Sequence, residues 1–342
     1  MIAVSCMACH EARAPLEPWV YEMPEEPPEG HVDVEVSHCG VCGSDCHQLA
    51  DAWGAACFPL VPGHEVVGHV RRLGRGVERF ELGRRVGIGP QRSSCCSCPS
   101  CNAGLEHICP LITKAYAGPG KDKGGFARTI RFPVRWAFAI PEDLPSELAA
   151  PLLCAGITTF APLKRHCRPG MRVGVVGVGG LGHVALQFAR AMGCAPVAIS
   201  KGEAKRQDAL AFGAEAHLVS SDTAQMAQAK ATLDVILNTA SGAAELDSYL
   251  ALLKPRGIMV CVGLPEKEQE SMTKLFLHSL VLQEKTLVGS YLGPHSDYDE
   301  MLAFAVAHGV RPQVELLPLE EANAAVERVR QGAARYRMVL TT

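Results

Sequence analysis

The chain has 342 residues, of which 48% are hydrophobic and 20% charged, and its 33 basic and 36 acidic residues give a net charge of −3. One hydrophobic core seldom organises more than about 250–300 residues, so this length predicts two domains. The balanced charge, without a long run of one sign, excludes the usual signature of a nucleic-acid or membrane-surface partner.

The N-terminal residues lack a basic segment followed by an apolar one, and no stretch reaches the roughly 18 apolar residues of a spanning helix. We therefore expect a cytoplasmic protein with no membrane partner. In a reducing compartment, 15 cysteines favour metal binding over a disulfide framework. Cys6, Cys9 and His10 have the spacing of a c-type haem attachment site. We reject haem because that attachment belongs to exported proteins.

The first half of the chain, to about Leu153, consists of short strand-like runs separated by Pro- and Gly-rich turns. Examples are His31–Val36 and Val66–Val70. The Pro-rich stretch 24–30 is predicted to be a turn or loop, because patterned sequence continues on both sides. This half is therefore predicted to be a mostly β domain.

After Leu153 the pattern changes to alternating strands and helices. A buried strand at 172–176 precedes an amphipathic helix at 181–192, which Gly193 ends, and a second strand follows at 196–199. This is a βαβ unit, and the later strand-like runs predict one parallel sheet. Those runs are 233–237, 258–262 and 286–290; the tail predicts helices at 296–308 and 320–331 and a last strand at 337–340.

Four cysteines, Cys95, Cys98, Cys101 and Cys109, have a spacing that lets a tight loop place four thiolates at the corners of a tetrahedron. Four thiolates around Zn²⁺ leave no open coordination position for a substrate. We therefore expect this zinc ion to stabilise the fold of its domain. Free or disulfide-bonded cysteines are the alternative. Cys96 does not fit the spacing, so we expect it not to bind the metal.

A glycine loop follows the first strand of the βαβ unit and opens its helix, which is the context of a dinucleotide-binding site. Its glycines permit a tight turn and a close approach to the pyrophosphate at the helix N-terminus. A purely structural turn is the alternative. The expected cofactor-binding residues of the loop are Gly177, Gly179, Gly180, Leu181 and Gly182.

The end of the next strand lacks the acidic residue that would hold the ribose hydroxyls of NAD. Ser200, Lys201, Lys205 and Arg206 stand there instead and suit the ribose phosphate of NADP. We therefore favour NADP(H) over NAD(H), although the same basic residues could begin a solvated helix.

Three separate segments, 39–47, 62–66 and 150–156, resemble the zinc-containing medium-chain alcohol dehydrogenases, in the cinnamyl alcohol dehydrogenase-like group. The resemblance covers essentially the whole chain, including Trp53-Gly54, 177–183 and 335–340. It implies an α/β fold with a GroES-like β domain at 1–155, rejoined by 292–342. A Rossmann domain with a doubly wound parallel sheet is implied at 156–291, with the active site between the lobes.

By this resemblance Cys42, His64 and Cys154 bind a catalytic zinc ion, with water or substrate in the fourth position. Two thiolates and a neutral imidazole balance the charge of the metal. A bound alkoxide then adds only one uncompensated charge, so zinc can lower the pKa of a bound alcohol.

The resemblance also implies roles for the neighbouring residues. Ser44 and His47 relay the proton to solvent, Asp45 orients His64, and Glu65 lies beside the metal. Thr158 matches a position packed by the nicotinamide, and Val262 and Ser290, at the ends of two later strands, are placed with the cofactor.

Gly43 departs from the family pattern, because members often carry His or Arg there against the cofactor pyrophosphate. Its loss of that contact is expected to weaken cofactor binding and to speed cofactor release.

The function implied is reversible hydride transfer between a primary alcohol and the nicotinamide, with small-molecule alcohols and aldehydes as partners. Trp53 and a lack of obvious charge near the motifs favour an apolar, aromatic or allylic substrate. A polyol or secondary-alcohol dehydrogenase is the alternative within the superfamily. A non-catalytic zinc- and NADP-binding redox sensor is the alternative from another class. The family implies a homodimer or homotetramer formed through the Rossmann lobe.

Overall fold

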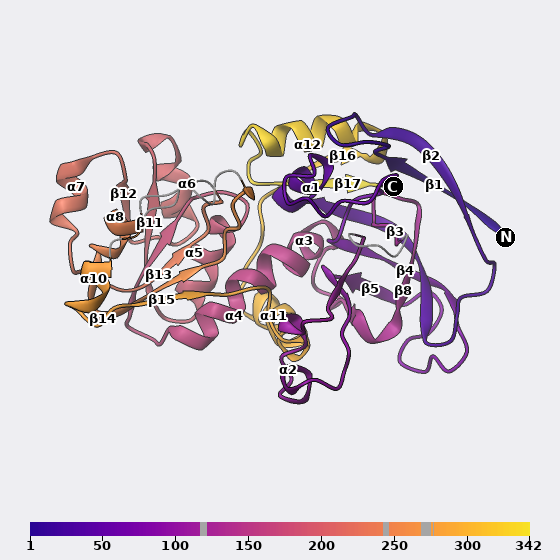
Figure 1. Ribbon diagram of the computed structural model, residues 1–342, viewed down its shortest axis with the longest axis horizontal. Coiled ribbons are helices and arrows are strands. Elements are labelled where there is room, and N and C mark those ends of the chain that lie inside the picture. The colour runs from indigo at the N-terminus through magenta and orange to yellow at the C-terminus, as the bar shows by residue number, and fades with distance from the viewer. Residues whose placement is uncertain (117–121, 242–245, 268–274, 276) are drawn as a thin grey trace. The chain divides into compact units, whose positions relative to one another are not determined.

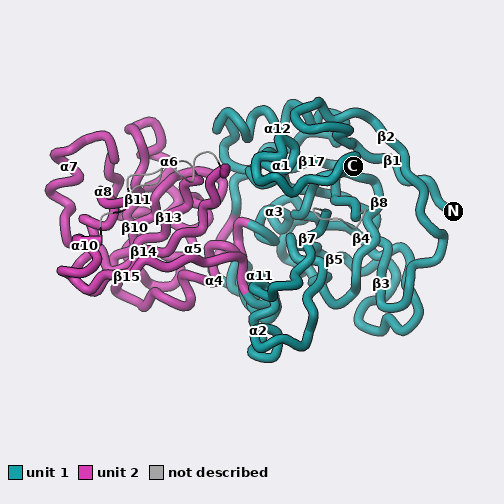
Figure 2. Tube along the Cα trace, in the orientation of Figure 1, with its two compact units in different colours: residues 1–154, 294–307, 312–342 teal, residues 155–293, 308–311 magenta. Residues whose placement is uncertain are grey.

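The computed structural model describes residues 1–116, 122–241, 246–267, 275 and 277–342 (Figure 1). It divides into two compact units (Figure 2). The first contains residues 1–154, 294–307 and 312–342, and the second contains 155–293 and 308–311. Residues 155, 292–293 and 308–311 thus belong to the second unit, whereas we predicted 1–155 and 292–342 for the first.

The first unit is built on a seven-stranded sheet with the order β16-β17-β3-β4-β5-β9, in which β8 also pairs with β3. Only the β16–β17 pair is parallel. The strands are β3 (His31–Val41), β4 (Val66–Leu73), β5 (Arg85–Ile88), β8 (Thr129–Pro133), β9 (Ala137–Ala139), β16 (Val314–Pro318) and β17 (Arg337–Thr341).

Smaller elements complete the first unit. Two two-stranded sheets pair β1 (Ile2–Ala8) with β2 (Glu17–Met23), and β6 (Gln91–Ser93) with β7 (Thr113–Lys114). The helices are α1 (Gly43–Leu49), α2 (Pro99–Asn102), α3 (Ser146–Pro151), α11 (His295–Ala307) and α12 (Ala322–Arg330).

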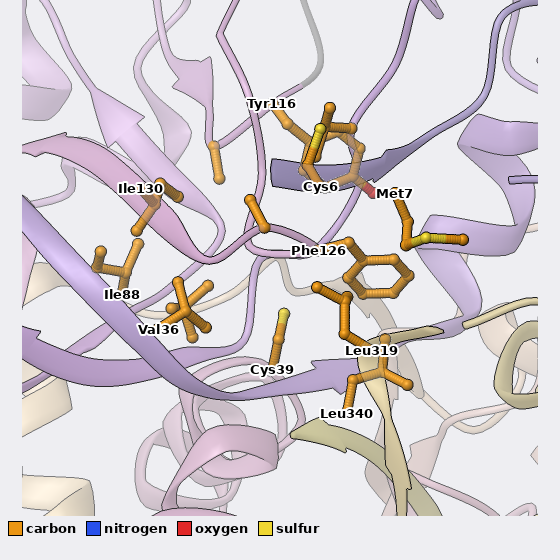
Figure 3. Packing of buried hydrophobic residues seen from close by; sticks show 14 of the residues in the cluster. Cys6, Met7, Val36, Cys39, Ile88, Tyr116, Phe126, Ile130, Leu319 and Leu340 are labelled. Atoms are coloured by element: carbon orange, nitrogen blue, oxygen red, sulfur yellow. The ribbon is translucent and has the colours of Figure 1, made fainter. Parts of the chain in front are cut away.

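The core of the first unit lies against β3, whose valines at alternate positions from Val32 to Val36 are buried. Figure 3 shows Val36, Cys39 and Leu340 packed around Phe126. Leu340 of β17 is the strand partner of Cys39 of β3, so the C-terminal strand completes this core. Burying each large apolar side chain stabilises the fold by about 1.5–3 kcal/mol.

The second unit contains a six-stranded parallel sheet with the order β12-β11-β10-β13-β14-β15. Chain order reverses direction between β10 and β13, which is where open sheets of this kind bind ligands. The strands are β10 (Arg172–Val176), β11 (Ala195–Ser200), β12 (Ala216–Val219), β13 (Leu233–Asn238), β14 (Leu253–Cys261) and β15 (Thr286–Gly289). The helices are α4 (Ile157–His166), α5 (Gly182–Ala191), α6 (Arg206–Ala211), α7 (Thr223–Gln228), α8 (Leu246–Leu250) and α10 (Leu277–Val281).

The parallel sheet and the mostly β first unit confirm the expected fold class. Among the described strands after residue 153, two were not predicted, β12 and β16. β12 has only four residues, and a histidine interrupts its apolar run. β16 lies at the edge of its sheet, and Glu315 and Pro318 interrupt its apolar run. Runs this short carry too little apolar periodicity to be recognised.

One helical run, Ser146–His166, is long and apolar enough to cross a membrane by length and composition. In the fold 83% of its most apolar window is buried, as in a core helix of a globular protein. The run includes a π-helical turn, Leu152–Gly156, between α3 and α4. It follows Pro151, which cannot donate a helical hydrogen bond.

Candidate metal centres and cofactor loop

Cys42, His64, Glu65 and Cys154 converge in the first unit, with one potential ligand atom from each lying within 4.8 Å of the others. Cys42 caps the N-terminus of α1, His64 and Glu65 precede β4, and Cys154 lies in the π-helical turn. The Cys42 and Cys154 sulfurs are 3.9 Å apart. All four residues are buried. Two thiols and an imidazole form the donor set that zinc prefers, so the residues fit the expected metal.

The Asp45 carboxylate holds this group together. It accepts hydrogen bonds from the backbone N–H groups of Cys42 (2.8 Å) and Gly63 (3.1 Å) and from the Tyr116 hydroxyl. Its Oδ1 also lies 3.2 Å from His64 Nδ1. This contact leaves Nε2 as the ring nitrogen for a metal.

The electrostatics of the ligands follow from burial and from one another. Burial disfavours a charged His64, but the Asp45 carboxylate and the Cys42 sulfur outweigh it and hold the His64 pKa well above its usual range. A hydrogen bond from Cys154 lowers the pKa of Cys42 well below that of a free thiol. The thiolate form that binds metal is therefore favoured at Cys42.

Glu65 is paired with Arg337 of β17, and both side chains are almost fully buried. Burial raises the pKa of Glu65 to about 7 despite the guanidinium. Its second oxygen, Oε2, is buried without a hydrogen-bond partner. A Cβ at Gly40 would lie 2.0 Å from that oxygen, so only glycine leaves room for the carboxylate.

Ser44 lies in the first turn of α1, next to the cysteine ligand, and His47 lies in its last turn. The Ser44 hydroxyl is 3.0 Å from the Cys42 sulfur. The His47 ring packs at 5.0 Å from the Trp53 ring, and Lys114 Nζ lies 5.7 Å from the centre of that same indole. Lys114 therefore places a charge beside Trp53, where none was expected from the sequence.

Cys95, Cys98, Cys101 and Cys109 form the second group of metal-ligating side chains, with their sulfurs also within 4.8 Å of one another. Backbone N–H groups of Cys98 and Leu111 point at the sulfurs of Cys95 and Cys109, at 3.3 Å each. Hydrogen bonds from Ser97, first from its backbone, lower the Cys95 pKa to about 6. These contacts favour the thiolate form of Cys95. Although a hydrogen bond from the Cys101 backbone opposes it, burial and the neighbouring thiols raise the pKa of Cys98 to about 11. Cys96 is exposed and stands outside the group.

The glycine loop joins β10 to α5 at the switch point of the parallel sheet. Gly177 has φ +89°, a conformation that other residues rarely adopt. A Cβ at Gly182 would lie 1.7 Å from the Gly177 carbonyl oxygen, whereas a Cβ at Gly179 would meet nothing within 4 Å. Gly182 is therefore needed to close the turn, and Gly179 borders open space. Gly180 and Leu181 complete the turn before α5.

The segment after β11 contains both basic residues and a carboxylate. The Ser200 hydroxyl lies 2.9 Å from the Gly202 carbonyl and 2.8 Å from His217 Nε2. Lys205 Nζ donates to the Val178 carbonyl in the glycine loop at 2.7 Å. Arg206 is paired with Glu203, a partner that the sequence analysis did not anticipate. Lys201 is exposed.

The remaining predicted cofactor residues lie in the second unit. Thr158 is buried in the first turn of α4. Val262 and Ser290 directly follow β14 and β15, at the same edge of the sheet as the glycine loop. Their N–H groups donate to Asn238 and Cys261 at 3.0 Å each.

Sequence reasoning missed Arg337, Tyr116, Gly40, His217 and Glu203. Arg337 offered one signal, because it begins an otherwise apolar strand, and a charged residue buried in such a strand needs a partner. Tyr116 and His217 reach their sites only because other segments pack there. Gly40 and Glu203 stand beside predicted site residues in sequence, but their partners are set by the fold.

Comparison with known proteins agrees with this geometry. Residues 28–142 match the alcohol dehydrogenase GroES-like domain, and residues 180–307 match the zinc-binding dehydrogenase family. A probable cinnamyl alcohol dehydrogenase of Oryza sativa subsp. japonica is 42% identical over 316 residues, which cover 90% of this chain and 85% of the relative. A mannitol dehydrogenase of Petroselinum crispum is also 42% identical, over 91% of this chain and 94% of the relative.

Solved structures give the same result. A cinnamyl alcohol dehydrogenase of Sorghum bicolor superposes with a TM-score of 0.95 at 38% identity, covering 99% of this chain and 98% of that one. The CAD of Helicobacter pylori, complexed with NADP(H), superposes with a TM-score of 0.92 at 29% identity, with the same coverage.

Proposed function

Since the chain belongs to the zinc-dependent alcohol dehydrogenases, which interconvert alcohols and aldehydes, we propose that it reduces aromatic or allylic aldehydes to primary alcohols with NADPH. The observation that carries the proposal is the buried convergence of Cys42, His64 and Cys154, with Asp45 beside the imidazole. When bound there, zinc would supply Lewis-acid polarisation of the substrate oxygen, and NADPH would supply the hydride.

The proposed roles of the protein groups follow from their contacts. Cys42, His64 and Cys154 hold the metal, and Asp45 fixes the His64 ring through Nδ1. Ser44, 3.0 Å from the Cys42 sulfur, is placed to pass a proton between the substrate oxygen and the solvent side, where His47 would exchange it. The four-cysteine loop holds a second, structural zinc ion.

We assign the cofactor preference to the segment that follows β11. Ser200, Lys201 and Lys205 offer a hydroxyl and two ammonium groups for a dianionic phosphate. Lys205 donates to the Val178 carbonyl, which keeps its ammonium group next to the glycine loop. The solved relative with bound NADP(H) supports the same choice. The test is kcat/KM with NADPH and NADH, and a preference for NADH would overturn it.

The substrate has a competing candidate. The mannitol dehydrogenase relative is as similar as the cinnamyl alcohol dehydrogenase relative, and Lys114 adds a charge beside Trp53. Both observations support a polyol dehydrogenase as the alternative assignment. A kinetic panel of cinnamaldehyde, benzaldehyde, butanal and sorbitol separates them. If sorbitol oxidation exceeded cinnamaldehyde reduction in kcat/KM, the aromatic assignment would be wrong.

We further propose a homodimer formed along β15, and a cytoplasmic location. β15 ends the strand order of its sheet, and the nearby α10 exposes Leu277 and Val281, with Leu282 directly after it. Unpaired strand edges and exposed apolar side chains are typical of interfaces. Light scattering tests the dimer: a monomer at micromolar concentration would contradict it.

The redox-sensor alternative finds no support among the relatives, which are named as dehydrogenases and reductases. The deciding experiment measures zinc content together with NADPH-dependent aldehyde reduction, in the wild type and in Cys154→Ser. We expect turnover in the wild type only. A zinc-loaded wild type without turnover on any aldehyde, but responsive to oxidant, would favour the sensor.

A further inference from the structure

His217 is a buried imidazole on β12, directly beside the proposed phosphate-binding hydroxyl of Ser200. Its side chain is 0% exposed, and its Nε2 lies 2.8 Å from Ser200 Oγ. The contact follows from strand register. His217 pairs with Ala198 of β11, and Ser200 projects on the same face two residues later.

Counting protons fixes the direction of this hydrogen bond. The Gly202 carbonyl, 2.9 Å from Ser200 Oγ, can only accept, so this close contact is a hydrogen bond when the single hydroxyl proton points to Gly202. With the proton pointing to Gly202, Ser200 Oγ accepts at its other contact. In that arrangement the Nε2–H tautomer of His217 donates to Ser200.

The other ring nitrogen of His217 points toward the charged groups of the same loop. Nδ1 is buried without a hydrogen-bond partner, and the nearest carboxylate oxygen, from Glu203, is 3.9 Å away. Glu203 is already paired with Arg206. Burial lowers the pKa of His217, which favours a neutral ring.

We propose that His217 is a specificity-determining residue that positions Ser200 for the 2′-phosphate of NADP(H). With the phosphate bound, the Ser200 proton turns from Gly202 to a phosphate oxygen, while His217 still donates to Ser200 Oγ. A hydroxyl that accepts one hydrogen bond donates the next more strongly, so the chain from imidazole to hydroxyl to phosphate is cooperative. The inference rests on the proposed NADP(H) preference.

The test measures equilibrium binding without turnover. Dissociation constants are determined for NADPH and NADH by cofactor fluorescence, and for 2′,5′-ADP and 5′-AMP by competition. The two nucleotides differ only in the 2′-phosphate. His217→Phe keeps a ring of similar shape without the donor, and His217→Gln keeps an N–H near the position of Nε2. If His217→Phe does not fold by thermal melting, His217→Leu replaces it.

For His217→Phe we expect NADPH and 2′,5′-ADP to bind about tenfold more weakly, with NADH and 5′-AMP changed by less than about twofold. His217→Gln should stay within about threefold of the wild type for all four ligands. Equal weakening of NADPH and NADH binding, or an unchanged NADPH:NADH ratio, would contradict the inference. A His217→Gln loss as large as that of His217→Phe would contradict the donor role.

A double-mutant cycle with Ser200→Ala tests whether His217 acts through the hydroxyl. We expect His217→Phe to cause no further loss of NADPH affinity in the Ser200→Ala background. Additive losses would show that His217 acts by another route. A wild type that binds NADH more tightly than NADPH would instead refute the proposed cofactor preference itself, so the two failures are distinguishable.

Discussion

Glu65 and Arg337 form a buried ion pair although they lie 272 positions apart in the chain. The pair connects the loop that carries the His64 ligand with the C-terminal strand β17, and Gly40 of β3 leaves the space for the carboxylate. The metal centre of the first unit therefore depends on a strand that follows the whole second unit in sequence.

Removing Arg337 should destabilise the folded protein. Arg337→Met leaves Glu65 buried without its counter-charge, and we expect the free energy of unfolding in urea to fall by about 3–5 kcal/mol. Arg75→Met is the matched control, because Arg75 and Glu29 form an exposed pair, which contributes at most about 1 kcal/mol. Equal effects of the two substitutions would show that the buried pair has no special structural importance.

The two zinc sites should be separable by mutation. Cys154→Ser is expected to retain one zinc ion per chain and a near-native melting temperature, while aldehyde reduction falls by about 10³-fold or more. Cys101→Ser should also retain one zinc ion but melt at a lower temperature, because its loop loses its cross-link. Atomic absorption and thermal denaturation measure both. Unchanged zinc content in either variant contradicts the corresponding ligand assignment.

Asp45 should control metal affinity without being a ligand. Asp45→Asn keeps the shape but weakens the contact with His64, and we expect zinc affinity of the catalytic site to fall about 10–100-fold. Chelator competition measures it. Asp222→Asn, at the N-cap of α7 in the other unit, is the control and should leave zinc affinity unchanged. An Asp45→Asn protein with wild-type affinity argues against the positioning role.

Two glycines of the cofactor loop should respond differently to alanine. Gly182→Ala places a methyl group against the Gly177 carbonyl, so the melting temperature and NADPH binding should both decrease. Gly179→Ala meets no atom within 4 Å and should fold normally, yet bind NADPH more weakly because the methyl group occupies the approach of the pyrophosphate. The prediction fails if Gly179→Ala binds NADPH as the wild type does.

Gly43 offers a gain-of-contact test. A side chain at Gly43 meets nothing within 4 Å, so Gly43→His should be tolerated by the fold. A hydrogen bond from the added imidazole to the cofactor phosphate should contribute about 1 kcal/mol. We therefore expect NADPH to bind several-fold more tightly and to be released more slowly. Stopped-flow displacement measures release. Unchanged affinity and release rate would contradict the expected effect of Gly43 on cofactor binding.

Local features of the chain were predictable from sequence. The spacing of Cys95 to Cys109, and the strand, glycine loop and helix from Arg172 to Ala191, depend on residues close in sequence. The parallel sheet was predicted because strands and helices alternate along the second half of the chain. Periodicity and turn chemistry act over that range, so the pattern itself indicates the structure. The grouping of Cys42, His64 and Cys154 came from family resemblance instead, because their spacing alone carries no signal.

What only the tertiary structure decided are the contacts between distant segments. The pairing of β3 with β17 brings Arg337 to Glu65, and the packing of the chain near Tyr116 brings its hydroxyl to Asp45. The register of β11 and β12 places His217 under Ser200. The sequence determined the chemistry of each residue and its local element. Its partners were decided by strand pairing and core packing, because these depend on the whole chain at once.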